Sequence, residues 1–119
     1  MYRRLEVWQE AISLIKKVYV LADMLPKSEE YNLKSQLKRA IVSVALNIAE
    51  GKCRSSAKDF AHFLNTSSSS LSEVEAIICI CVELEYFKEN KEIYDDIRTL
   101  NKRINALRNK LLKENSNAK

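Results

Sequence analysis

The sequence predicts an all-α protein, and three observations lead to that prediction. The 119 residues include only one glycine and one proline, whereas the many tight turns of a sandwich or barrel depend on such residues. Apolar residues recur at helical spacing along four long segments, and no segment shows the strict alternation of a half-buried strand. A chain of this length suits one domain with one modest core. We therefore expect residues 1–119 to form a single helical domain.

The first predicted helix covers about residues 5–25, and apolar side chains occupy roughly half of its circumference. A core-facing stripe is usually nearer 100° wide. The excess predicts a second contact, either a long groove within the monomer or a subunit interface. Pro26 ends this helix because it disfavours the α conformation in the residue before it.

The second predicted helix covers about residues 28–50, with Ser28 as N-cap and Gly51 in the C′ position. It is apolar on two sides, which is typical of a central helix. Between those sides runs one polar stripe, roughly 80° wide at 100° per residue. The stripe consists of Gln36, Arg39, Ser43, Asn47 and Glu50.

A polar stripe on a central helix is expected to be at least partly buried, and each buried polar group needs a partner. Ser70 and Glu73, three residues apart on the next helix, are the candidate partners. An Arg39–Glu73 ion pair would then neutralise charge inside the bundle. Two interpretations remain open for this set: a hydrogen-bonded network that fixes the register of the bundle, or the lining of a pocket or subunit interface.

The third predicted helix covers about residues 56–87, and Ser56 with Asp59 resembles a capping box. The serine run 66–70 is typical of a linker in composition. The apolar residues nevertheless keep a helical phase through it, so we expect a continuous helix whose small residues let a neighbour approach closely.

The fourth predicted helix covers about residues 91–113, with Asn90 as a plausible N-cap and a tail, 114–119, that we expect to fray. Its apolar residues repeat at spacings of four and three, as in a single packing seam. Four such helices joined by short turns predict an antiparallel up-down-up-down four-helix bundle.

The basic residues form a second candidate site. The net charge is only +4, which permits an acidic partner without requiring one. The fourth helix, however, carries many cations after residue 97, and a second basic group follows the second helix. The candidate nucleic-acid-binding residues are Arg98, Lys102, Arg103, Lys110, Lys113, Lys52 and Arg54. No aromatic residues interleave with them, so contacts to phosphates rather than stacked bases are expected. The alternative is an ordinary solvated face.

Catalytic, metal and cofactor sites are not predicted. The one histidine, His62, has no spaced Cys, Ser or Asp partner set. Its separation from Arg54 does not fit the arginine and histidine pair of some helical-bundle ribonucleases. Di-iron bundles need inward carboxylates with Glu-x-x-His pairs, which are missing, and a single glycine excludes a phosphate-binding glycine loop. We therefore expect a non-enzymatic protein.

The cysteines favour a reducing compartment. Cys53, Cys79 and Cys81 make an odd count, and the last two point away from each other on one helix. We expect three free thiols, two of them buried, and a cytoplasmic location. The longest apolar run, 76–82, is far too short to span a membrane.

Several motifs resemble those of the bacterial four-helix bundle proteins encoded by intervening sequences in 23S ribosomal RNA genes. They are Leu5-Glu6-Val7-Trp8-Gln9-Glu10-Ala11, Gln36-Leu37-Lys38-Arg39-Ala40, Ser43 to Gly51 with Arg54 and Ser55, and Phe63-Leu64 followed by Ser69 to Glu75. The resemblance covers about residues 5–87. The Asn-Ile-Ala-Glu-Gly segment at the end of a helix is its most specific part.

The resemblance implies a homopentameric ring. Related proteins include the accessory subunit of diversity-generating retroelements, which binds nucleic acid and a reverse transcriptase. The sequence thus predicts a non-enzymatic, oligomeric protein that contacts RNA or DNA phosphates, with structured RNA as the preferred ligand. The competing hypothesis is a scaffold or adaptor for an acidic protein such as a polymerase or reverse transcriptase. A nuclease ranks last.

Overall fold

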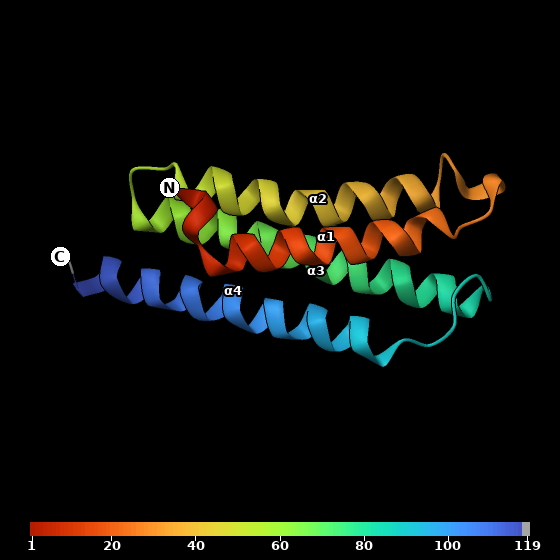
Figure 1. Cartoon of the computed structure of the whole chain (residues 1–119). Coiled ribbons are helices and arrows are strands. Elements are labelled where there is room, and N and C mark those ends of the chain that lie inside the picture. The colour runs from red at the N-terminus through yellow and green to blue at the C-terminus, as the bar shows by residue number, and fades with distance from the viewer. Residues whose placement is uncertain (118–119) are drawn as a thin grey trace.

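The computed structural model describes residues 1–117 and consists of four long helices, which confirms the all-α prediction. They are α1 (Glu6–Asp23), α2 (Leu33–Lys52), α3 (Ala57–Glu83) and α4 (Lys91–Asn117), with short 3-10 helices at Tyr2–Arg4 and Lys27–Glu29. The described residues include no strand. Figure 1 shows the helices lying along one long axis, with successive connections at alternate ends and both termini at the same end. The molecule measures 53 × 24 × 20 Å.

The predicted caps of the last two helices are confirmed. The Ser56 hydroxyl accepts a hydrogen bond of 3.0 Å from the Asp59 backbone N–H, and the Asn90 amide oxygen accepts one of 3.2 Å from the Ile93 N–H. Each side chain satisfies one of the backbone donors that the first turn of a helix leaves unpaired. These residues therefore fix the starts of α3 and α4.

The predicted start and end of α2 were wrong. The helix begins at Leu33, because residues 27–29 form a separate 3-10 turn and Ser28 makes no capping bond. At its other end the helix continues through Gly51 to Lys52, and Gly51 does not have the positive φ of a C′ glycine. A glycine is needed here because α3 packs too closely to leave room for a side chain. A Cβ at this position would lie 2.8 Å from Phe60 Cδ1 and 2.8 Å from Phe63 Cβ.

Three further ends differ from the prediction, and the first is that of α1, which stops at Asp23 rather than 25. Helix α3 stops at Glu83 rather than 87, and Glu85 adopts a left-handed φ of 65° in the turn that follows. Helix α4 continues to Asn117, so residues 114–117 are helical rather than frayed. The predicted fraying of residues 118–119 lies outside the described residues.

The serine run is helical, as predicted, and it lies against α2. Ser67 is fully buried in α3, and its hydroxyl donates a 2.8 Å hydrogen bond to the Val44 carbonyl of α2. The core is formed by the apolar faces of all four helices, with Leu37, Ile41, Leu64, Leu71 and Ile104 among its fully buried side chains. None of the described helices is long and apolar enough to cross a membrane.

Replacing Gly51 by alanine should destabilise the fold. The added methyl group would have to displace two phenylalanine side chains, which costs about 1–3 kcal/mol of unfolding free energy in a packed interior. The greater helix propensity of alanine offsets at most about 1 kcal/mol. Urea unfolding at fixed protein concentration measures the change. Glu50→Ala, one residue earlier on an exposed face, is the control and should change stability by about 0.5 kcal/mol or less. Equal stability of G51A and wild type would contradict the close approach.

A larger side chain at position 67 should destabilise the fold far more than a larger side chain at position 69. Ser67→Leu places three extra carbons between α2 and α3 and removes the bond to Val44, so a loss of about 2 kcal/mol or more is expected. Ser69 is on the same helix but exposed, so Ser69→Leu should leave the midpoint of thermal unfolding nearly unchanged. Similar midpoints for the two variants would show that α2 and α3 are not closely packed here.

Candidate functional site

The predicted polar stripe of α2 is only partly buried. Ser43, Asn47 and Ser70 are half-buried, and they are bonded to one another: the Ser43 and Ser70 hydroxyls are 3.0 Å apart. The Asn47 amide donates to the Ser43 carbonyl at 2.8 Å and to the Ser43 hydroxyl at 3.0 Å. This part of the prediction, a hydrogen-bonded contact between α2 and α3, holds.

Burial of the other four residues was predicted wrongly. Gln36, Arg39, Glu50 and Glu73 are exposed, and no Arg39–Glu73 ion pair forms among the described residues. The physical reason is that α3 packs on the side of α2 that carries Val44, so the stripe lies at the edge of the contact. Short side chains at this edge reach inward, whereas long ones extend into solvent.

All seven predicted nucleic-acid-binding cations are exposed, but three of them are already paired. Arg98 Nε lies 3.2 Å from Glu75 Oε1, Arg54 lies 2.6 Å from Glu50, and Arg103 pairs with Glu10. Lys52, Lys102, Lys110 and Lys113 take part in none of the ion pairs formed within residues 1–117. Of the seven predicted residues, these four lysines are therefore the most readily available to an anionic ligand.

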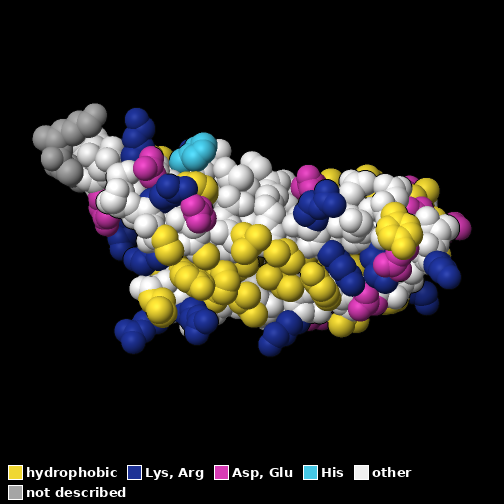
Figure 2. Space-filling view, turned by 90° about the horizontal axis from the view of Figure 1, so that it is seen from above, with side chains coloured by type: hydrophobic (Ala, Val, Ile, Leu, Met, Phe, Trp, Pro, Cys, Tyr) yellow, Lys and Arg dark blue, Asp and Glu magenta, His cyan; other side chains and the backbone are white. Residues whose placement is uncertain are grey.

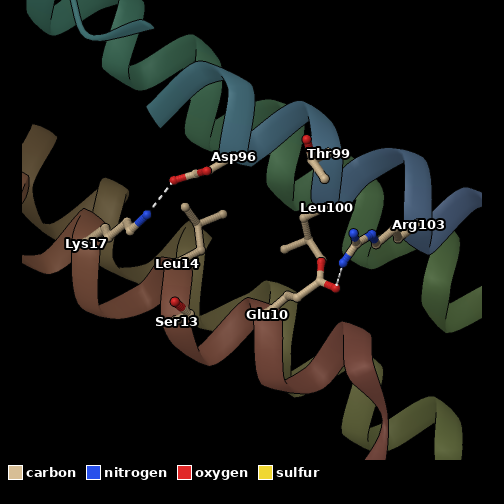
Figure 3. A pocket seen from close by; sticks show the side chains of 8 residues that line it. All are labelled: Glu10, Ser13, Leu14, Lys17, Asp96, Thr99, Leu100 and Arg103. Carbon is tan, nitrogen blue, oxygen red and sulfur yellow. Dashed lines mark hydrogen bonds and ion pairs between the residues drawn. The ribbon is translucent and has the colours of Figure 1, made fainter. Parts of the chain in front are cut away.

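Arg103 lies on a different side of α4 from Arg98. Figure 3 shows it in a hollow of about 230 Å³ between α1 and α4, where its guanidinium meets Glu10 and where Lys17 meets Asp96 at 2.6 Å. The hydrogen bond to Asp96 raises the pKa of the Lys17 ammonium. The two ion pairs balance the charge of this hollow, so it offers no net attraction for phosphate.

The outer face of α4 forms a shallow groove that sequence reasoning described only in part. Its lining consists of Arg98, Asn101, Lys102, Asn105, Ala106 and Asn109, around a volume of about 520 Å³. Ser68 of α3 hydrogen-bonds to Asn101 at 2.5 Å, and Asn105 donates to Asn101 at 3.2 Å. The missed signal was the spacing of the three asparagines, which recur every four residues and so share one helix face.

A second hollow lies between the start of α3 and the later part of α4. It has a volume of about 210 Å³ and is lined by Lys58, Ala61, His62, Asn65, Arg108 and Leu112. Neither this hollow nor the α4 groove is lined by a carboxylate. The α1–α4 hollow, by contrast, includes Glu10 and Asp96. A phosphate group is bound by cationic side chains and by amides that donate hydrogen bonds, and nearby carboxylates would repel it.

Charge is unevenly distributed along the molecule. The basic end is the end that holds both termini and the α2–α3 connection (Figure 1), and it consists of residues 1–10, 47–70 and 101–117. It carries twice as many cations as acids. The cations are Arg3, Arg4, Lys52, Arg54, Lys58, Lys102, Arg103, Arg108, Lys110 and Lys113, and the acids are Glu6, Glu10, Glu50, Asp59 and Glu114. In the rest of the described chain, acids outnumber cations.

The wide apolar arc of α1 continues onto α2 as a partly exposed surface. Trp8, Ile12, Ile15 and Tyr19 are half-buried along one face of α1, and Leu46 of α2 is 61% exposed. Lys38 of α2 lies 4.7 Å from the Tyr19 ring centre, so these faces are adjacent. Figure 2 shows hydrophobic side chains gathered in a broad patch at the centre of one side of the molecule. The surface formed by Trp8, Ile12, Ile15, Tyr19, Leu46, Val42 and Ala49 is called the α1–α2 apolar face.

The cysteines and the histidine are not gathered into a metal-binding group in the part of the chain that the structure describes. All three cysteines are free, and no group of three potential metal ligands occurs within residues 1–117. Cys81 is buried, and burial raises the pKa of its thiol. Two buried thiols were predicted, but Cys53 and Cys79 are both exposed. Cys79 lies on the side of α3 near Tyr94, with 3.6 Å between its Sγ and the phenol oxygen. His62 is exposed.

Comparison with known proteins identifies relatives that cover most of the bundle. A family model described as 23S rRNA-intervening sequence protein matches residues 3–106. A solved structure from Bacteroides thetaiotaomicron, described as a protein of unknown function from the S23 ribosomal protein family, is similar with a TM-score of 0.70 at 24% sequence identity. That similarity covers 90% of this chain and 98% of the Bacteroides chain, which shows a common fold. Among proteins with curated descriptions, none matches the chain.

Proposed function

The chain belongs to the 23S rRNA-intervening sequence protein family, and we propose that it is a non-enzymatic protein that binds the phosphate backbone of structured RNA. The observation that carries this proposal is the acid-free α4 groove, together with the unpaired lysines beyond it. Lys102 lines that groove, and Lys110 and Lys113 follow along the same helix without ion-pair partners in the described residues.

Electrostatics supports a backbone ligand rather than a base-specific one. Each lysine that meets a phosphate releases condensed counterions, which is the main source of sequence-independent affinity. The asparagines of the groove can donate to phosphate or sugar oxygens. Each contact is weak at an exposed site, so one copy of the chain would bind weakly.

We further propose that the antiparallel bundle assembles into a homopentameric ring in the cytoplasm. The α1–α2 apolar face supports assembly, since large exposed apolar patches usually mark contacts with other proteins. A ring would repeat the basic end in every copy, and linked weak contacts raise the apparent affinity without any new contact. The same apolar face also favours the competing function, an adaptor that binds another protein.

Neutralising three lysines of α4 should weaken RNA binding and make it less dependent on salt. The logarithm of the affinity falls with the logarithm of the salt concentration by about 0.7 to 0.9 for each phosphate contact, the lower value applying to single strands. The combined variant Lys102→Gln, Lys110→Gln and Lys113→Gln should therefore reduce this slope by about 2 to 3. Fluorescence anisotropy of a labelled RNA hairpin, followed from low to moderate salt, measures both quantities.

The matched control changes three lysines at the opposite end of the molecule. Lys27→Gln, Lys88→Gln and Lys91→Gln remove the same charge from exposed positions and should leave most of the affinity and the salt slope in place. Equal losses in the two triple variants would mean that net charge alone attracts RNA. Wild-type binding that does not change with salt would reject the phosphate contact altogether.

A charge placed in the α1–α2 apolar face should break up the assembly. Leu46 is 61% exposed, and Val20, on the side of α1 that faces α4, is 65% exposed, so neither substitution should unfold the bundle. Leu46→Glu is expected to lower the molar mass measured by light scattering to that of one chain, whereas Val20→Glu should leave the mass unchanged. An unchanged mass for L46E, or dissociation caused by V20E, would overturn this assignment.

The absorbance ratio at 260 and 280 nm, recorded in the same light-scattering experiment, separates the two functions. Nucleic acid that co-purifies with the wild-type assembly raises the ratio. A purified complex that contains a stoichiometric acidic protein and no nucleic acid would instead favour the adaptor.

A further inference from the structure

The hollow between α3 and α4 contains an unusual arginine. Arg108 is half-buried, whereas the other six arginines of the chain are exposed. It takes part in none of the ion pairs formed within residues 1–117. Partial removal of a guanidinium from water without an opposite charge is unfavourable. A bound anion would relieve that cost.

Three other polar side chains share the hollow with Arg108. Lys58, His62 and Asn65 recur along α3 at spacings of four and three, so they project from one face of that helix. With Arg108 they line a volume of about 210 Å³ that includes no carboxylate. Lys58 also lacks an ion-pair partner in the described residues. Two cations, a histidine and an amide thus converge on one space.

The surroundings of the hollow favour negative charge as well. Lys58 and His62 belong to the first turns of α3, which starts after its Ser56 cap, and the start of a helix carries a partial positive charge. The nearest acids in sequence, Asp59 and Glu114, do not line the hollow. Apolar Ala61 and Leu112 complete the lining.

We propose that this hollow, which we call the phosphate pocket, binds a single phosphate group of a nucleic acid. Arg108 supplies paired N–H donors that match the geometry of a phosphate, Lys58 supplies a second charge, and His62 and Asn65 can each donate a hydrogen bond. The volume holds one tetrahedral anion with several waters. This proposal rests on the proposed function for the origin of the phosphate, and it identifies a defined binding site between α3 and α4.

The first test uses inorganic phosphate as the probe. Two-dimensional ¹H–¹⁵N spectra of the full-length protein are recorded with phosphate, and with sodium chloride at the same ionic strength. Phosphate should shift the amide signals of residues 58–65 and 108–112 selectively. Arg108→Gln should weaken that binding about tenfold, because a hydrogen bond to a charged group is lost. Lys58→Gln, at an exposed position where folding is not at risk, should weaken it in the same direction.

Lys88→Gln is the matched control, since it removes one exposed lysine at the far end and should leave phosphate binding unchanged. Shifts spread evenly over lysines of both ends would overturn the pocket, and so would equal losses in K88Q and R108Q. Shifts that are confined to the pocket but persist unchanged in both R108Q and K58Q would also overturn it.

The second test identifies the source of the phosphate. Unlabelled RNA hairpins with and without a 5′-phosphate are added to the protein in the presence of inorganic phosphate. Displacement of inorganic phosphate by both hairpins assigns the pocket to the internal backbone, and displacement by the phosphorylated hairpin alone assigns it to the chain end. Displacement by neither would overturn the nucleic-acid source and leave a site for free phosphate.

The two proposals fail in different ways. A protein that fails to bind RNA but retains pocket-specific phosphate shifts would reject the proposed function and keep the pocket. A protein that binds RNA while the signals of residues 58–65 and 108–112 stay in place would reject the pocket and keep the function.

Discussion

The close approach of α2 and α3 is the constraint on which the rest of this structure depends. At Gly51 there is no room for a Cβ beside Phe60 and Phe63, and at Ser67 a fully buried hydroxyl reaches the Val44 carbonyl. Small residues at the contact let two backbones come close, and the polar atoms that this closeness buries are satisfied across it. Ser43, Asn47 and Ser70 extend the same contact to the edge of the pair.

Once α2 and α3 are fixed, the remaining helices divide the surface into unlike regions. Helix α1 covers one side of α2. Part of the wide apolar arc of α1 stays at the surface and belongs to the α1–α2 apolar face. Helix α4 packs on α3 and leaves Lys102, Lys110 and Lys113 exposed. A connection of only a few residues between α2 and α3 brings Lys52 and Arg54 over the rings of Phe60 and Phe63, at 5.9 and 4.8 Å. The basic end is thus a consequence of where the helices begin and end.

Periodicity and capping predicted most of the fold, because they depend on local physics. The number of helices, the caps at Ser56 and Asn90, and the helical serine run follow from spacing and backbone donors alone. The ends of α2 could not be predicted in this way. Gly51 fits a C-terminal cap by pattern, but tertiary packing decides its role. The predicted burial of the whole polar stripe was wrong for a similar reason. Spacing places Arg39 and Ser43 on one face, and only the position of α3 decides which of them is shielded from solvent. The phosphate pocket combines residues from two helices far apart in sequence, so spacing within one helix could not reveal it.

The unequal ends also give the chain a permanent electric dipole along its longest dimension. A polyanion exerts a torque on such a molecule from a distance comparable with the screening length, about 8 Å at physiological salt. The chain would therefore arrive with its termini leading and its acid-rich end pointing away. In any cyclic assembly whose symmetry axis runs along the bundles, every copy points the same way, so one rim would be cationic and the other anionic. Such a ring would have two chemically distinct poles, and only one of them would receive nucleic acid.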